Sequence, residues 1–93
     1  MQNDKFKAVL GNSPEVKILE LLIEGREFDY TFNDIIRGSK INRNRAYPLL
    51  GSHLKQGLII ESRKVKNLTF YKLNIHKKEI KLLLEIYDSL VAS

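Results

Sequence analysis

The chain has 93 residues, of which 43% are apolar and 29% charged, with no cysteine and a formal net charge of +5. This length and apolar fraction predict one globular domain over residues 1–93 and argue against a disordered chain. The lack of cysteine excludes disulfides and thiolate metal sites, and the lack of a long apolar run excludes a membrane span and a secretory signal.

Stop and start signals mark the first two predicted helices. A short helix over Asp4–Leu10 is closed by Gly11. Ser13 then offers a capping hydroxyl, and Pro14 occupies the first helical position, where its missing N–H costs nothing. The second helix runs from there to Glu24, with apolar residues at the helical period.

Two further helices follow, joined by a tight turn. Thr31 and Asp34 have the spacing of a capping box and begin a helix of barely two turns that stops at Gly38. The four residues from Gly38 onward form the turn. The next helix begins after the capping residue Asn42 and stops at Gly57.

The C-terminal half predicts a hairpin and a last helix. Leu58–Val65 and Leu68–Asn74 are rich in β-branched and aromatic residues, and Lys66-Asn67 between them suits a tight turn. Ile75–Val91 predicts a long helix. The fold class is therefore α+β and mostly α, in the order of a winged helix-turn-helix: three helices, a two-stranded β wing and a C-terminal dimerisation helix. The parts are an N-terminal arm (1–12), a winged-helix core (13–74) and the dimerisation helix (75–93).

The helix after Asn42 has the surface that reading duplex DNA requires. Its apolar side is predicted to face the core through Ala46, Leu49, Leu50, His53 and Leu54. Its opposite side is small or hydrogen-bonding, with Asn44, Pro48, Gly51, Ser52 and Lys55. A helix enters the major groove only if bulky side chains do not hold it away from the bases. Because Asn pairs with adenine and Arg with guanine, the candidates for base contact are Arg43, Asn44 and Arg45.

The charge is unevenly distributed along the chain, and the middle third is strongly basic. Residues 1–36 have a net charge of −3, residues 37–72 a net charge of +8 and residues 73–93 a net charge of zero. One sign gathered in one segment indicates a polyanionic partner, although a solubilising basic face is the alternative. Two arginines in the first turn after Asn42 oppose the helix dipole, which favours a compensating ligand over simple exposure.

Further polar residues of the middle third are candidates for contact with the DNA backbone. They are Arg37, Ser39, Lys40, Tyr47, Ser52 and Lys55. At the tip of the hairpin, the candidates for DNA contact are Arg63, Lys64, Lys66 and Asn67, since the minor groove attracts cations. The alternatives are that the hairpin charges protect an edge strand from aggregation and that the residues near the turn are simply exposed.

Three stretches of the middle third resemble the PadR-type winged-helix regulators. They are Arg45-Ala46-Tyr47-Pro48-Leu49-Leu50, Gln56-Gly57-Leu58-Ile59 and Phe70-Tyr71-Lys72-Leu73, which resemble the recognition helix, the start of the wing and its second strand. The likeness covers residues 31–74, and the layout is similar to small winged-helix proteins of archaeal type. It implies the winged-helix fold. In that family the residue at Tyr47 usually belongs to the fold, which is the alternative to a contact between its hydroxyl and a phosphate.

The last helix is predicted to join two copies of the chain, with help from residues 4–10. The expected seam has the spacing of helix–helix contacts and consists of Ile80, Leu83, Leu84, Tyr87 and Leu90. Leu82 and Ile86 point elsewhere. The alternative is that a small domain buries both faces of this helix itself.

We expect no enzyme, no cofactor and no metal. His53 is expected in the core and His76 at the surface in the first turn of the last helix, and neither has a partner at metal-ligand spacing. The chain has no phosphate-binding glycine loop, no nucleophile motif and no catalytic pair of carboxylates.

The sequence therefore predicts a homodimer that binds double-stranded DNA at a palindromic site, most simply as a transcriptional regulator in the cytoplasm, on nucleoid or plasmid DNA. The chain also resembles the site-binding adaptor of archaeal plasmid partition systems, which spreads on DNA and recruits a partner protein. Spreading needs a second contact surface, for which the candidates are Glu20, Glu24, Glu27 and Asp29, unless these acids only solvate their helix. A winged helix used only for protein–protein contact is disfavoured by the basic middle third.

Overall fold

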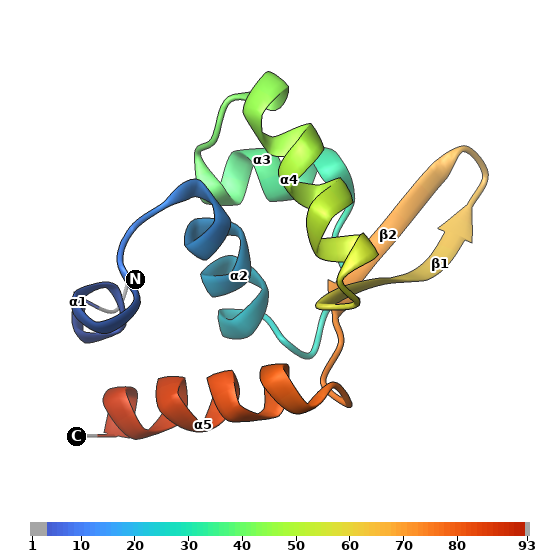
Figure 1. The fold of residues 1–93 in the computed structure, drawn as a ribbon. Coiled ribbons are helices and arrows are strands. Elements are labelled where there is room, and N and C mark those ends of the chain that lie inside the picture. Colours follow the sequence, from blue (N-terminus) through green and yellow to red (C-terminus); the bar gives the residue numbers. More distant parts are fainter. Residues whose placement is uncertain (1–3, 93) are drawn as a thin grey trace.

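The fold is that of a computed structural model, which describes residues 4–92. Its elements follow the predicted order (Figure 1): α1 (Asp4–Leu10), α2 (Pro14–Glu24), α3 (Phe32–Ser39), α4 (Arg43–Lys55), β1 (Ile59–Val65), β2 (Leu68–Leu73) and α5 (Lys78–Ala92). The chain is α+β and mostly helical, as predicted. Residues 1–3 of the predicted arm and residue 93 of the predicted last helix lie outside the described residues. Between residues 4 and 92, no helix has the length and apolar character needed to span a membrane.

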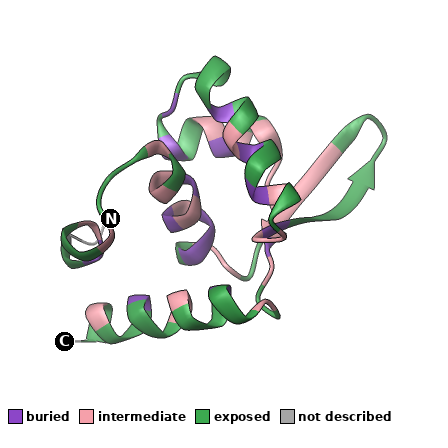
Figure 2. Cartoon of the chain, in the orientation of Figure 1, coloured by how far each residue is buried: buried purple, intermediate pink, exposed green. Residues whose placement is uncertain are grey.

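The core lies where α2 meets the other helices and the base of the hairpin. Its largest fully buried side chains are Phe6, Ile18, Leu22, Ile23, Ile35, Ile59, Leu73 and Ile80. Figure 2 shows α2 buried or half-buried along most of its length, whereas α5 is mostly exposed. The rings of Phe6 and Tyr87 meet edge to face with centroids 5.2 Å apart, so α1 and α5 close the core on one side. Arg26 donates to both carboxylate oxygens of Asp88, at 2.7 and 3.1 Å, and ties the end of α2 to α5.

The predicted start signals of α2 and α3 are confirmed. The Ser13 hydroxyl accepts a hydrogen bond from the N–H of Val16 at 3.2 Å. Thr31 and Asp34 form the predicted capping box, in which each side chain accepts from the backbone N–H of the other residue, at 3.2 and 3.1 Å. These local bonds satisfy N–H groups that a helix start would otherwise leave unpaired.

The predicted stop of α3 at Gly38 is wrong. The helix continues to Ser39 and is ended by Lys40, whose backbone is left-handed with φ 59° and whose N–H donates to the Ile36 carbonyl at 2.9 Å. Gly38 serves packing instead, because a Cβ atom there would lie 2.7 Å from a methyl group of Leu21 on α2. The glycine therefore allows α2 and α3 to approach closely.

The hairpin is attached to the helical part along β2. Its turn has two residues, Lys66-Asn67, as predicted. Ser62 is an extra residue in β1 that interrupts the pairing with β2 and forms a bulge. Tyr30, in the connection between α2 and α3, exchanges two backbone hydrogen bonds with Tyr71, at 2.8 and 2.7 Å. The hairpin is thus fixed to the segment that leads into α3.

The last helix begins later than predicted. Asn74 forms a turn before it, in which its side chain accepts from the N–H of His76 at 3.3 Å and donates to the Gly57 carbonyl at 2.9 Å. The helix α5 therefore starts at Lys78 and not at Ile75, and His76 lies in the preceding turn, exposed as expected.

The apolar stripe of α5 packs on its own chain. Ile80 and Tyr87 are buried in the core, so the expectation that they form a seam between two chains is wrong for these two residues. The other predicted seam residues, Leu83, Leu84 and Leu90, are half-buried against the same core. The residues predicted to point elsewhere are the exposed ones, since Leu82 is 50% and Ile86 41% exposed.

Candidate nucleic-acid interface

The two sides of α4 are as predicted. The buried or half-buried side chains are Ala46, Leu49, Leu50, His53 and Leu54. The outward residues are all exposed: Asn44, Arg45, Tyr47, Pro48, Gly51, Ser52 and Lys55. The helix is not interrupted at Pro48, and Asn42 caps it by accepting from the N–H of Asn44 at 2.7 Å.

Gly51, in the middle of the exposed side, is not required by the fold. A Cβ atom there would meet nothing within 4 Å. Glycine in a helix interior costs about 1 kcal/mol relative to alanine, because it loses more backbone freedom on folding. The chain therefore keeps a flat outward surface on α4 at a cost in stability.

Arg43 is held at the corner where α3 and α4 meet. Its guanidinium donates to the side-chain oxygen of Asn33, and its Cζ lies 5.4 Å from the centre of the Phe32 ring. The Tyr47 ring meets the same Phe32 ring edge to face, at 5.7 Å and 81°. The roles of Asn33 and Phe32 could not be predicted from the sequence, because ten residues separate Asn33 from Arg43. The capping box at the start of α3 does not indicate a contact with Arg43.

Two hollows join α4 to the hairpin through this corner. One, of about 400 Å³, is lined by Phe32, Arg43, Asn44 and Tyr47. The other, of about 280 Å³, is lined by Thr31, Phe32, Asn33, Arg43, Asn67, Leu68, Thr69 and Tyr71. Phe32 and Arg43 belong to both, so one continuous surface contains the starts of α3 and α4 and the hairpin turn.

The exposed charges near the hairpin turn are those of Lys64 and Lys66, with Asn67 beside them. Arg63, the fourth residue predicted here, is also exposed, but its guanidinium has partners within the chain. Its guanidinium donates to both carboxylate oxygens of Asp29, at 2.8 and 3.2 Å, and lies 4.1 Å from the centre of the Phe70 ring. Arg63 therefore anchors the side of the hairpin to the segment after α2.

Asp29 receives a third hydrogen bond at this anchor, from the hydroxyl of Ser62 at 2.6 Å. Hydrogen bonds from Arg63 and Ser62 stabilise the charged carboxylate and lower the pKa of Asp29 to about 2. The anchor is therefore charged and intact throughout the neutral range. The bulge at Ser62 is what presents this hydroxyl to Asp29, and no pattern in the sequence predicted it.

The residues around the α3–α4 turn have different environments. Ser39 is buried, and its hydroxyl donates to the Ile35 carbonyl at 2.6 Å, so the expectation that it contacts DNA is wrong. Arg37 is exposed and pairs with Asp34 at 2.6 Å on the same helix. Lys40 is exposed at the end of α3.

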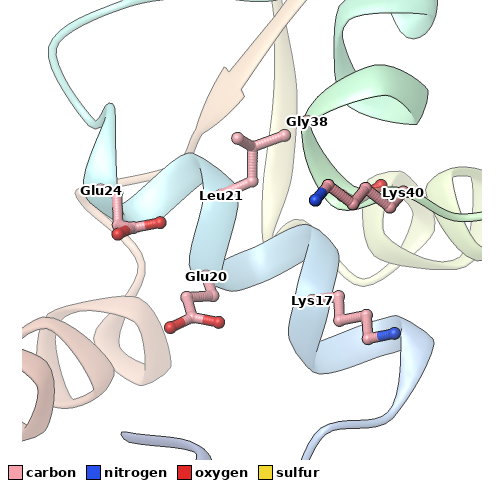
Figure 3. A pocket seen from close by; sticks show the side chains of 7 residues that line it. Lys17, Glu20, Leu21, Glu24, Gly38 and Lys40 are labelled. Carbon is pink, nitrogen blue, oxygen red and sulfur yellow. The ribbon is translucent and has the colours of Figure 1, made fainter. Parts of the chain in front are cut away.

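Lys40 also borders a pocket of about 280 Å³ on the side of α2. Figure 3 shows Glu20 and Glu24 at one end of this pocket and Lys17 and Lys40 at the other. Glu20 is buried, with 3% of its surface exposed. Partial burial and the nearby charge of Glu20 raise the pKa of Glu24.

The predicted acidic contact surface is therefore reduced. Glu20 is buried and Asp29 is bound to Arg63, so the expectation that these two offer charge to a neighbouring molecule is wrong. Glu24 and Glu27 remain exposed.

His53 lies in the core, as predicted, with 5% of its surface exposed. Neither ring nitrogen reaches a hydrogen-bond partner at normal geometry among residues 4–92. Burial lowers the pKa of His53, against a smaller opposing effect of the Glu15 backbone. The described part of the chain also has no group of three or more His, Asp or Glu side chains placed to hold a metal ion.

No protein-family model, no curated protein and no solved structure matches this chain. The role of the surface formed by α4 and the hairpin turn therefore has to follow from its residues and their geometry.

Proposed function

We propose that the chain is a homodimeric, sequence-specific protein for double-stranded DNA, with α3 and α4 as a helix-turn-helix and the hairpin as a wing, and that it regulates transcription. The observation that carries this proposal is the outward side of α4. It is flat at Gly51, where the fold has no need of glycine, and it ends in hydrogen-bonding and cationic side chains. A helix that enters the major groove needs this combination.

In this proposal α4 contacts the base edges through its first turn. Asn44 presents an amide that pairs with adenine, and Arg45 a guanidinium that pairs with guanine. The guanidinium of Arg43 is already oriented by Asn33 and Phe32, so less side-chain freedom is lost when it binds. Preorganised donors of this kind favour a specific site over random DNA.

The remaining cations fix the chain on the DNA backbone. Those around α4 are Arg37, Lys40 and Lys55, with the hydroxyl of Ser52 beside them. The wing adds Lys64, Lys66 and Asn67 at its turn, where cations suit the negative potential of the minor groove. The Asp29–Arg63 anchor sets the direction of the wing relative to the helices.

The regulator is favoured over a protein that spreads along DNA. Spreading requires a second contact surface between neighbouring dimers. Two of the four acids that would supply it are engaged within their own chain. A protected region that extends steadily beyond two half-sites on a long DNA fragment would reverse this preference.

The test is binding to a specific duplex and to random duplexes over a range of salt concentrations. Asn44→Ala or Arg45→Ala should cost about 1–3 kcal/mol on the specific site and relax its sequence preference. Lys66→Ala should weaken binding to all sequences alike and reduce the salt slope by about 1. The control is Lys81→Ala, which removes the same charge from α5 and should leave binding unchanged. No DNA binding at low salt would refute the proposal.

A further inference from the structure

The aromatic ring of Tyr47 occupies a position that the core does not explain. The residue is 71% exposed on α4, three positions after Asn44, so both side chains lie on the same side of the helix. The ring is not loose, because it packs edge to face on Phe32 with centroids 5.7 Å apart. An exposed aromatic ring that packs on Phe32 thus lies next to the leading candidate for adenine contact.

The hollow beside this ring is largely apolar. It is lined by the rings of Phe32 and Tyr47, with the side chains of Arg43 and Asn44. The guanidinium of Arg43 contacts Phe32 and Asn33, and these contacts orient it beside the hollow. Such a hollow suits a small apolar group that protrudes from a polar surface.

The major groove offers one apolar group on the edges of its bases, the C5 methyl group of thymine. We infer that the hollow between Tyr47 and Arg43 binds the methyl group of a thymine next to the base pair that Asn44 contacts. This inference rests on the proposed function and adds a specificity-determining residue to it. Tyr47 acts here through its ring, whereas a contact to a phosphate would use its hydroxyl.

The experiment uses a duplex selected from random-sequence DNA by the full chain. Each thymine of this duplex is replaced in turn by uracil, which removes the methyl group and keeps every hydrogen-bonding group of the base. At one thymine per half-site, uracil should weaken binding about fourfold, the effect of exposing one methyl group. At the other positions it should have no effect.

Two variants then identify the side chain that binds this methyl group. Tyr47→Ala should bind the thymine and uracil duplexes equally, because the wall of the hollow is gone. Tyr47→Phe keeps the ring and should retain the full fourfold preference for thymine. Circular dichroism checks that both variants are folded, which the exposure of Tyr47 predicts.

Three results would overturn the inference while specific DNA binding stands. Uracil has no effect at any position, or Tyr47→Ala keeps the preference for thymine, or Tyr47→Phe loses as much affinity as Tyr47→Ala. The last result would assign Tyr47 to a phosphate. If no duplex were enriched by the selection, the proposed function would fail, and the inference with it.

Discussion

We expect His53 to make the stability of the folded chain depend on pH. Its imidazole is buried without a hydrogen-bond partner of normal geometry among the described residues, and burial disfavours its charged form. The pKa of His53 in the folded chain is therefore lower than the ordinary value of 6.5, which applies to the unfolded chain. Between these two values the unfolded chain binds a proton that the folded chain does not, so the free energy of unfolding falls as the pH falls.

We predict that stability is fully present above pH 6.5 and decreases as the pH is lowered below that value. His53→Leu removes the titrating group and should make the free energy of unfolding less dependent on pH over this window. Urea unfolding at several pH values between about 7.5 and 5.5 measures both curves. His76→Leu, at the exposed histidine, is the control and should keep the slope of the unsubstituted chain. If His53→Leu kept that slope, burial of His53 would not be the cause.

At the scale of elements, the exposed side of α4 contains residues that do not favour a stable helix. Two residues on its exposed side are poor helix formers, Pro48 in the helix interior and Gly51 near its middle. The packing of the helix depends on its other side, where Ala46 and Leu50 are buried. We therefore expect that stability and the proposed DNA binding can be changed separately on this helix.

Substitution of Gly51 tests this separation. Gly51→Leu should raise the free energy of unfolding by about 0.5–1 kcal/mol, since leucine is a better helix former and the site is open. The same side chain should hold α4 away from the bases and lower the affinity for the specific duplex at least about tenfold, a cost of about 1.4 kcal/mol. Thermal unfolding and fluorescence anisotropy measure the two effects. Lys81→Leu on α5 should leave DNA affinity unchanged. A Gly51→Leu variant with undiminished affinity would mean that this side of α4 does not face DNA.

The order and type of these elements could be predicted because their signals are local. The Ser13 cap, the Thr31–Asp34 box and the Lys66-Asn67 turn each depend on residues within a few positions of one another, and all three form as predicted. The two sides of α4 follow in the same way from the helical period. Local patterns were sufficient for these features.

What could not be predicted depends on contacts between distant segments. The Arg63–Asp29 pair joins residues 34 positions apart and attaches the hairpin to the segment after α2. In the sequence Gly38 resembles a helix stop, whereas its role is the close packing against Leu21 of α2. For α5, the period identified the apolar stripe but could not say whether its own core or a second chain covers it.

At the scale of the whole molecule, α5 lies across α2 from α3 (Figure 1). In the view of Figure 1, the α3–α4 corner and the hairpin turn lie away from most of α5. A second chain bound at α5 would leave α4 and the wing of both chains free for one duplex.

We therefore expect the dimer contact on the outward side of α5, through Leu82 and Ile86 in place of the buried Ile80 and Tyr87. A chain with a small core and no disulfide gains stability when such exposed apolar side chains are covered. Leu82→Asp with Ile86→Asp should give a folded monomer by light scattering, because neither side chain is needed in the core. Phe28→Asp, at a residue 65% exposed in the connection between α2 and α3, should stay dimeric. The monomer should bind a duplex with one half-site as well as it binds the full palindrome, whereas the dimer should prefer the palindrome by at least about tenfold. A double variant that remained dimeric would place the contact elsewhere on the chain.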